Sequence, residues 1–320
     1  MRRTIISRNI FKNLSMANPP PISSHIKPPI LVTKSKLEQR DLQQLFHHEI
    51  TALQIKSFYP PAHAKLIANE LNEKAKEGKM DNWRVGTERG LEVSDVWTEG
   101  EYTPYNVAIA MDREKEYFDG VQKDFRNRRR VTDSDAEGGG DYQPRLWPLD
   151  LLRLELDEVW MDGAGLARTK DKRVQGGGLP RIMIGPTRWK KGFIHADQFA
   201  PLSKTEGLFS GNIYLQLPHS DCTKDAGLGD LQIWNLGISS QVDWYRYRDL
   251  LKGLTTQDAG LQLKLRKELG EPLQVHVEAG DLVMLCVQKP HCAVGFLNGT
   301  RISLQCFVQY RMNDGLLIDI

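Results

Sequence analysis

The amino-acid sequence predicts an α+β protein, with helices mainly in its first half and a β-sandwich or small barrel in its second. Before Gly178 apolar residues recur at helical spacing, whereas after it short apolar runs alternate with turn residues. The chain has 320 residues, 40% of them hydrophobic and 26% charged, so it can bury a substantial core. Its longest apolar run, residues 282–287, is far shorter than the roughly 20 residues that a membrane-spanning helix needs. We therefore expect a soluble protein with no membrane span.

The N-terminal segment, residues 1–36, is strongly basic. It carries a charge of +7 and no acidic residue, whereas residues 38–320 hold 36 basic and 41 acidic residues, a net charge of −5. Arginines, serine and apolar residues on one helical face are typical of an organellar transit peptide, for a plastid or mitochondrion, and the prolines at 19–21 and 28–29 predict an extended linker. The alternative is a disordered basic tail without a targeting function, on a cytoplasmic protein. In both cases we expect residues 1–36 to lie outside the fold.

Residues 37–178 are expected to form a mixed, largely helical part that supports the barrel. Helical spacing and flanking prolines predict helices over residues 62–76, 112–126 and 148–160. The arginines of 126–130, followed by acidic residues and glycines up to residue 140, predict a mobile surface loop. Because the body is acidic and no aromatic residues interleave with these arginines, the sequence does not favour nucleic-acid binding.

Residues 179–320 are expected to form the β-rich core. Turn residues separate six apolar, strand-like runs: 181–184, 209–217, 230–236, 273–277, 281–287 and 301–308. A helical insertion over residues 244–269 interrupts them, and Gly270 is suited to end its last helix.

The four cysteines form no C-x-x-C pair, which fits a reducing, intracellular compartment better than a secretory one. Cys286 and Cys306 lie in apolar runs and are expected to be buried free thiols. A zinc site that uses His219 and Cys222 is an alternative, but no second pair with ligand spacing accompanies it.

Metal chemistry is indicated by the pattern His-x-Asp/Glu, because residues i and i+2 of a strand project to the same side. Non-haem iron that activates O₂ needs two imidazoles and one carboxylate on one face, with the remaining positions open. Composition predicts roughly one such pair by chance. The chain has four, which are His47/Glu49, His195/Asp197, His219/Asp221 and His276/Glu278.

Sequence context selects the second of these pairs. The first pair lies in the helical half, the third in a polar, turn-rich segment, and the fourth at a turn too close to His291 to leave room for intervening strands. His195 and Asp197 instead follow one predicted strand and precede the others. A third ligand can then return to them from a late strand of the same barrel.

His291 is the candidate for that third ligand, because it opens a predicted strand after the run 282–287. Ten residues later come Arg301 and Ser303, which point the same way on a strand and can face the barrel interior together with His291. A buried guanidinium there needs a carboxylate partner, which it binds through two parallel hydrogen bonds, and a neighbouring hydroxyl adds another.

These residues resemble the motif set of the Fe(II)/2-oxoglutarate-dependent oxygenases, whose fold is the double-stranded β-helix, a jelly-roll of the cupin type. The resemblance extends over residues 181–311. It implies that His195, Asp197 and His291 bind iron, and that Arg301 and Ser303 hold the distal carboxylate of 2-oxoglutarate. Fe(II) is then the cofactor, with 2-oxoglutarate and O₂ as co-substrates, and no catalytic residue is expected beyond the metal centre.

Segments such as Asp243-Trp244-Tyr245 and Ser303-Leu304-Gln305 also resemble a subgroup of these oxygenases that acts on free amino acids. Halogenases of that subgroup replace the carboxylate ligand by glycine, whereas this chain keeps Asp197. The basic leader and the intact ligand set are similar to those of algal kainoid synthases, which close a pyrrolidine ring on an N-prenylated glutamate. Simple amino-acid hydroxylation is the alternative within the family. A module that binds a dicarboxylate without turnover is the alternative outside enzymes.

Further side chains are expected near a carboxylate-bearing substrate. Arg181 and Arg188 supply positive charge near the proposed iron against the acidic background of the body. Trp234, Tyr310 and Met312 are weaker candidates for the pocket lining. The oligomeric state is not legible in the sequence.

Overall fold

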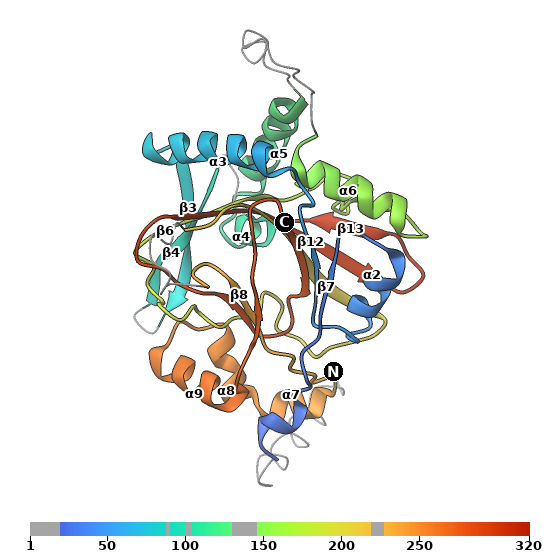
Figure 1. Cartoon of the computed structure of the whole chain (residues 1–320), viewed down its shortest axis with the longest axis vertical. Helices are drawn as coiled ribbons and strands as arrows, with labels where there is room; N and C mark the ends of the chain where they lie inside the picture. Colours follow the sequence, from blue (N-terminus) through green and yellow to red (C-terminus); the bar gives the residue numbers. More distant parts are fainter. Residues whose placement is uncertain (1–19, 88–89, 100–103, 130–145, 219–226) are drawn as a thin grey trace.

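The computed structural model describes residues 20–87, 90–99, 104–129, 146–218 and 227–320 (Figure 1). Its main sheet has ten strands. Eight follow one another in the order β1 (Leu31–Lys34), β2 (Ala52–Ile55), β10 (Leu282–Cys286), β7 (Glu206–Gln216), β12 (Thr300–Arg311), β6 (Leu179–Ile184), β4 (Gly90–Glu99) and β3 (Met80–Thr87). The other two, β13 (Leu316–Asp319) and β5 (Ala164–Leu166), extend from β12.

A smaller sheet contains β11 (His291–Ala293), β8 (Leu231–Ile233) and β9 (Leu273–Val275), in that order. An isolated antiparallel bridge between His195 and His291 adds the segment around His195 beside β11. The chain passes from β6 to the His195 bridge, back to β7, across to β8 and β9, back to β10, across to β11 and back to β12. Such alternation between two antiparallel sheets is a jelly-roll, which confirms the predicted double-stranded β-helix.

The two faces of β12 explain how this core is built. Side chains at alternate positions of a strand point to opposite faces of the sheet. Apolar residues on one face of β12 join the largest hydrophobic cluster, namely Ile302, Leu304, Cys306 and Val308. The residues of the other face, most of them polar, line the interior cavity, namely Arg301, Ser303, Gln305, Phe307 and Gln309.

Three helices cover the outer face of the main sheet. They are α2 (Gln39–Phe46), α3 (Pro61–Lys76) and α6 (Pro148–Val159), and their apolar residues share the large cluster with β7, β10 and β12 (Figure 1). Helix α6 contributes the fully buried Leu152 and Leu156, four positions apart and thus on one helical face. Near β6 lie α4 (Tyr105–Ala110) and α5 (Glu114–Arg129), whose buried aromatic residues pack with Leu179.

The predicted helical insertion is confirmed as α7 (Gln241–Arg246), α8 (Arg248–Leu251), the short helix η3 (Lys252–Leu254) and α9 (Ala259–Leu269). These helices pack on the smaller sheet, in a cluster that includes Trp234 and Cys292. Asp258 caps α9 by accepting a hydrogen bond from the Leu261 backbone at 2.6 Å. Gly270 ends it with a positive φ of 67°, as the sequence predicts.

The N-terminal boundary of the fold was predicted wrongly. Residues 31–34 form β1, which pairs in parallel with β2, and Ile22 in the short helix η1 (Ile22–His25) is only 2% exposed. The Asn235 side chain also donates to the Pro28 carbonyl at 3.0 Å. Residues 22–34 belong to the fold because β1 pairs with the edge of β2 and because Ile22 packs on the apolar surface of the insertion. The predicted transit peptide falls largely on residues 1–19, outside the described residues.

The other predicted elements are confirmed, with small changes in their ends. The three expected helices correspond to α3, α5 and α6, and the six expected strands to β6, β7, β8, β9, β10 and β12. The predicted loop beyond residue 129 lies outside the described residues, whereas residues 126–129 belong to α5. Cys286, Cys292 and Cys306 are buried free thiols. Within the described residues, no helix combines the length and the apolar character needed to span a membrane.

Candidate metal centre

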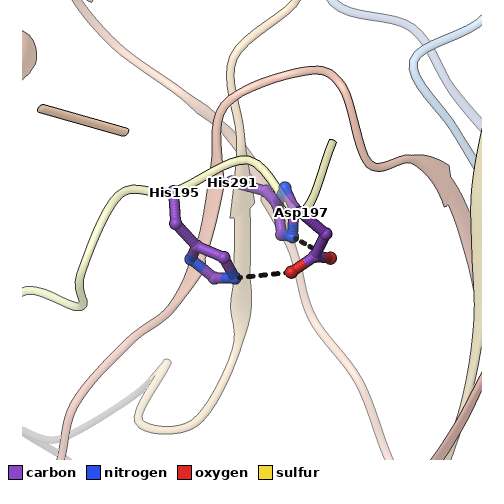
Figure 2. A group of neighbouring side chains, drawn as sticks. All are labelled: His195, Asp197 and His291. Carbon is purple, nitrogen blue, oxygen red and sulfur yellow. Dashed lines mark ion pairs between the residues drawn. The ribbon is translucent and has the colours of Figure 1, made fainter. Parts of the chain in front are cut away.

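His195, Asp197 and His291 come together beside β11 of the smaller sheet (Figure 2). The His195 backbone N–H donates to the His291 carbonyl, and the His291 N–H donates to the His195 carbonyl, both at 2.9 Å. The Asp197 N–H donates to the Val287 carbonyl at 3.0 Å, which ties the same loop to the end of β10. Backbone hydrogen bonds thus hold the neighbouring residues His195 and Asp197 beside His291, which is far from them in the sequence.

The side chains of the three residues converge on one point (Figure 2). The Asp197 carboxylate lies between the imidazoles, with its Oδ1 3.7 Å from His195 Nε2 and its Oδ2 3.5 Å from His291 Nε2. The candidate ligand atoms all lie within 4.8 Å of one another. Among the described residues, no other group of three His, Cys, Asp or Glu side chains is arranged in this way.

Both imidazoles are held through their other ring nitrogen. His195 Nδ1 lies 2.9 Å from the Phe193 carbonyl, and His291 Nδ1 lies 2.9 Å from the Lys289 carbonyl. A carbonyl only accepts, so in each ring the Nδ1–H donates and the lone pair remains on Nε2, toward Asp197. Metal-binding histidines in proteins are commonly oriented by such a bond.

The charges of the three groups suit a cation. Burial, reinforced by His291, lowers the pKa of His195 to about 4 against the opposing effect of Asp197, so its ring is neutral at pH 7. Burial raises the pKa of Asp197, but the contact with His291 and the charges of both histidines and Arg181 outweigh it and lower the pKa to about 2. For His291, burial lowers the pKa but Asp197 outweighs it and raises it overall.

The donor set fits a divalent transition metal. Two imidazoles and one carboxylate, on one side of a partly open site, are the facial arrangement used by non-haem iron. The side chains of His195 and Asp197 are 34% and 24% exposed, so the group remains accessible to further ligands of an ion. The three residues that the sequence predicted as metal ligands are therefore adjacent and correctly oriented.

The three side chains line a cavity of about 850 Å³ inside the jelly-roll. Arg301 and Ser303 line it from β12, and Tyr214 lines it from β7 directly opposite Ser303. Arg301 is 7% exposed and Ser303 is 1% exposed. The interior of the barrel therefore holds both the predicted ligands and the predicted carboxylate-binding pair.

The Arg301 guanidinium is buried without an acidic partner. Its Nε donates to the Gly229 carbonyl at 3.0 Å, and its centre lies 5.0 Å from the centre of the Tyr214 ring. None of the described Asp or Glu residues forms an ion pair with it, and the buried Tyr214 hydroxyl has no well-aligned hydrogen-bond partner among the described residues. A buried cation in this situation is stabilised by an anionic ligand. Burial also raises the pKa of Tyr214, against the opposing charge of Arg301, so its hydroxyl remains a donor.

Arg181 lies in the same cavity, on β6 opposite Ser303. Its Nε donates to the Gln305 side chain at 2.8 Å. Burial lowers its pKa to about 10, although Asp197 opposes this effect, so it remains cationic at pH 7. Arg188 is exposed and does not itself line the cavity, but it contacts two residues that do, Asp95 and Gln257, as well as the Val93 carbonyl.

Of the three weaker candidates for the cavity lining, two do not line the cavity, and the third lies mostly in the core outside it. Trp234 is 1% exposed and donates to the Gly270 carbonyl at 2.8 Å, so it belongs to the core beneath the insertion. Met312 is 49% exposed and does not line the cavity, because β12 ends at Arg311. Tyr310 touches one end of the cavity, but its ring is stacked on Phe46 in the outer core. It lies an even number of residues after Val308, so it points to the outer face of β12.

The other His-x-Asp/Glu pairs do not build a site in the described residues. His47 lies next to Tyr310, 3.4 Å from its hydroxyl, on the outer side of the main sheet. The His276 side chain is 76% exposed and contacts Asp230. His219, Asp221 and Cys222 lie outside the described residues.

Sequence reasoning missed several cavity residues, among them Tyr214, Asn212 and Gln305. Gln305 has the same strand parity as Arg301 and Ser303, so the alternation on β12 could have indicated it. Tyr214 depends on the register between β7 and β12, which shifts at a bulge between Ile302 and Ser303 and leaves no signal in the sequence.

No family model and no curated protein sequence matches the chain. Among solved structures, similar ones include a prolyl-4-hydroxylase from Pseudomonas putida, with 14% identity and a TM-score of 0.39 over 86% of this chain and 98% of that one. The carbocyclase SnoK from nogalamycin biosynthesis has 14% identity and a TM-score of 0.43 over 88% and 90% of the two chains. An N-substituted L-amino acid dioxygenase from Burkholderia ambifaria has 11% identity and a TM-score of 0.37 over 75% and 100%. At these values the likeness is distant and adds nothing to the geometry described above.

Proposed function

We propose that the protein is an Fe(II)- and 2-oxoglutarate-dependent oxygenase that oxidises a C–H bond of a small, amino-acid-derived molecule. The observation that carries this proposal is the presence, in one cavity, of a His195–Asp197–His291 ligand set and a buried Arg301 without an acidic partner. The first suits a redox-active metal, and the second suits a carboxylate. The pair of features matches a metal-chelating 2-oxo acid with a distal carboxylate.

Each residue has a defined role in this proposal. His195, Asp197 and His291 would hold Fe(II), which when bound supplies the O₂-dependent oxidation coupled to decarboxylation of 2-oxoglutarate. Arg301 would bind the distal carboxylate of 2-oxoglutarate, with hydrogen bonds from the Ser303 and Tyr214 hydroxyls beside it. The carbonyls of Phe193 and Lys289 keep each imidazole proton on Nδ1.

The cavity itself would hold the substrate in place and exclude water from it. Leu231, Leu285 and Phe307 line it, so bound groups are held against an apolar wall away from bulk water. No general acid or base beyond the metal centre is required, because the reacting carbon is selected by where it is held. The protein therefore determines the outcome mainly through the placement of its substrate.

For the substrate, we propose a molecule that carries at least one carboxylate. Arg181 supports this, because its guanidinium lines the cavity and remains charged at neutral pH. The narrower proposal is oxidative ring closure of an N-prenylated glutamate, as in the kainoid synthases that parts of the sequence resemble. Hydroxylation of an amino acid would use the same residues and differs only in the position of the reacting carbon.

Turnover of 2-oxoglutarate tests the catalytic part of the proposal. The purified protein, supplied with Fe(II), ascorbate and air, is expected to convert 2-oxoglutarate to succinate when offered N-alkylated glutamates. Product analysis by mass spectrometry would distinguish ring closure from hydroxylation. Succinate release with free lysine or leucine, but not with glutamate derivatives, would contradict the kainoid assignment and leave the oxygenase assignment intact.

A matched variant pair tests the role of Arg181. Arg181→Gln is expected to raise the substrate KM about tenfold or more, because one charge-assisted hydrogen bond is lost. Arg188→Gln, outside the cavity, is expected to leave the substrate KM unchanged. Equal effects of the two substitutions would contradict a direct role for Arg181.

A further inference from the structure

A second cavity, of about 980 Å³, lies on the outside of the fold between α5, α6 and the segment that includes β5. None of its described lining residues lines the cavity of the metal centre. We call it the α5–α6 groove and define it by Arg128, Trp147, Arg153 and Arg173, with Phe118 and Phe125 among its apolar walls.

Buried hydrogen-bond donors without partners face this groove. The Arg128 side chain is only 6% exposed, although it lies in the last turn of α5. Its Nη2 contacts Asp124 at 2.6 Å and donates to the Gly178 carbonyl at 3.1 Å, whereas its buried Nε and Nη1 have no partner among the described residues. The indole N–H of Trp147 is likewise buried and without a partner there. Leaving such groups unpaired costs about 1–3 kcal/mol each, so their retention points to a ligand that accepts hydrogen bonds.

The charge of the groove favours an anion. The described residues that line it include four arginines, namely Arg128, Arg153, Arg168 and Arg173, and one carboxylate, that of Asp150, while Asp124 pairs with Arg128 beside it. Arg168 donates to the Lys172 carbonyl, and Arg173 lies over the Phe118 ring, 3.5 Å from its centre. Arg153 has neither a hydrogen bond nor an ion pair among the described residues. This concentration of arginine stands out in a chain whose body has a net negative charge.

The rest of the lining is apolar. Phe118, Val121, Phe125 and Leu154 lie along the same groove, with Arg128 5.4 Å from the centre of the Trp147 ring. Donors without acceptors suit oxyanion oxygens, and aromatic or aliphatic walls suit the apolar body of the same molecule.

We propose that the α5–α6 groove is a second ligand site, distinct from the metal centre, which binds a small organic anion with a phosphate or carboxylate head and an apolar body. The head accepts hydrogen bonds from Arg128 and the Trp147 indole, and Arg153 adds charge at the rim. The apolar body rests against Phe118 and Phe125.

Phenyl phosphate is a suitable probe, because it combines the two parts of the proposed ligand. The full-length protein, with ¹⁵N-labelled tryptophan, would be titrated with phenyl phosphate while the indole N–H signals are followed by NMR, with the Trp147 signal assigned through Trp147→Phe. We expect a saturable shift of that signal, a weaker effect of inorganic phosphate and no effect of benzyl alcohol. The shift is also expected in His195→Ala, since the groove does not include the metal centre.

Two variants separate the site from general surface charge. Arg153→Gln removes a lining arginine that supports no other described contact, so it is expected to fold normally and to raise the Kd for phenyl phosphate about tenfold. Arg126→Gln removes an exposed arginine from the same helix and is expected to leave the Kd unchanged.

Three results would overturn the proposal. The first is no shift of the Trp147 signal up to about 10 mM phenyl phosphate, where even millimolar binding is visible. The second is an equal loss of binding in Arg153→Gln and Arg126→Gln. The third is binding that emerges only after Asp133, Asp135 and Glu137 are changed to amides, because the chain's own acidic residues would then occupy the groove.

Discussion

At the scale of single residues, the candidate metal centre depends on hydrogen bonds that fix proton positions. His195 and His291 each direct Nδ1–H to a backbone carbonyl and leave Nε2 toward Asp197, where an ion would bind. Both carbonyls belong to residues two positions earlier, so the local backbone conformation sets the tautomer. A short stretch of sequence therefore encodes both the proposed ligand and its orientation.

Arg301 provides the first prediction at this scale. Arg301→Gln removes the cation that would pair with the distal carboxylate of 2-oxoglutarate but leaves the three metal ligands in place. We expect the Kd for 2-oxoglutarate to rise by about tenfold to a hundredfold, the usual range for a lost charge-assisted hydrogen bond. Isothermal titration of the anaerobic Fe(II) protein measures it.

The same titration with Arg188→Gln is the control for this prediction. That arginine does not itself line the cavity, although it contacts Asp95 and Gln257, which do. Unchanged 2-oxoglutarate affinity in Arg301→Gln would remove the assigned role of Arg301.

The placement of His195, Asp197, His291 and Arg301 in one cavity could be predicted from the sequence, because their spacing follows strand parity. Trp234 could not be placed in the same way. It follows directly after β8, where an apolar residue gives no sign of whether it faces the cavity or the opposite side, and here it packs beneath the insertion. Tyr214 carries no pattern of its own, since only the register of β7 against β12 brings it to Ser303.

At the scale of elements, the N-terminal segment contributes more than its composition indicates. Its prolines and positive charge are typical of a linker, yet β1 extends the main sheet and Ile22 is buried against the insertion. A four-residue strand in parallel pairing has too few residues to give a periodic signal. The sequence therefore could not reveal where the fold begins.

A pair of isoleucines tests the importance of this segment. Ile22→Ala is expected to lower the free energy of unfolding by about 2–5 kcal/mol, because a buried side chain is replaced by a cavity. Ile30→Ala is the matched control, since Ile30 is 48% exposed against 2% for Ile22. Urea denaturation measures both. Similar midpoints for the two variants would contradict a structural role for this segment.

Strand β13 carries a titratable group with consequences for stability. Burial raises the pKa of Asp319 to about 6, although the hydrogen bond from the Gln309 side chain opposes this shift. The folded protein therefore binds this proton more tightly than the unfolded chain does. As a result, the stability contribution of the protonated group is present at low pH and is lost as the pH rises through about 4 to 6.

Asp319→Asn should remove this dependence. We expect the melting temperature of the variant, minus that of the unmodified protein at the same pH, to increase from pH 4 to pH 7. The increase should correspond to about 1–3 kcal/mol in the free energy of unfolding. Asp162→Asn, at an exposed position, is the control. A relative melting temperature that is independent of pH would contradict the prediction.

At the scale of the whole molecule, one face of the main sheet forms the core, and its other face encloses the cavity together with the smaller sheet. The outer face of the main sheet is covered by α2, α3 and α6 and forms the large core, whereas its inner face and the smaller sheet enclose the cavity (Figure 1). The insertion α7–α9 supports the smaller sheet, on which β11 presents His291. The jelly-roll was predictable because its strands are regular and well separated by turns, whereas β1–β5 and β13 depend on partners distant in the sequence.

The central claim, that one cavity binds both iron and 2-oxoglutarate, is tested most directly by absorption spectroscopy without oxygen. Adding Fe(II) and 2-oxoglutarate to the anaerobic protein should produce the visible charge-transfer band of the chelate. The band should persist in His276→Ala, whose side chain is exposed and does not line the cavity, and disappear in His195→Ala and His291→Ala. Absence of the band in folded, iron-loaded protein, or its retention in both ligand variants, would contradict the claim.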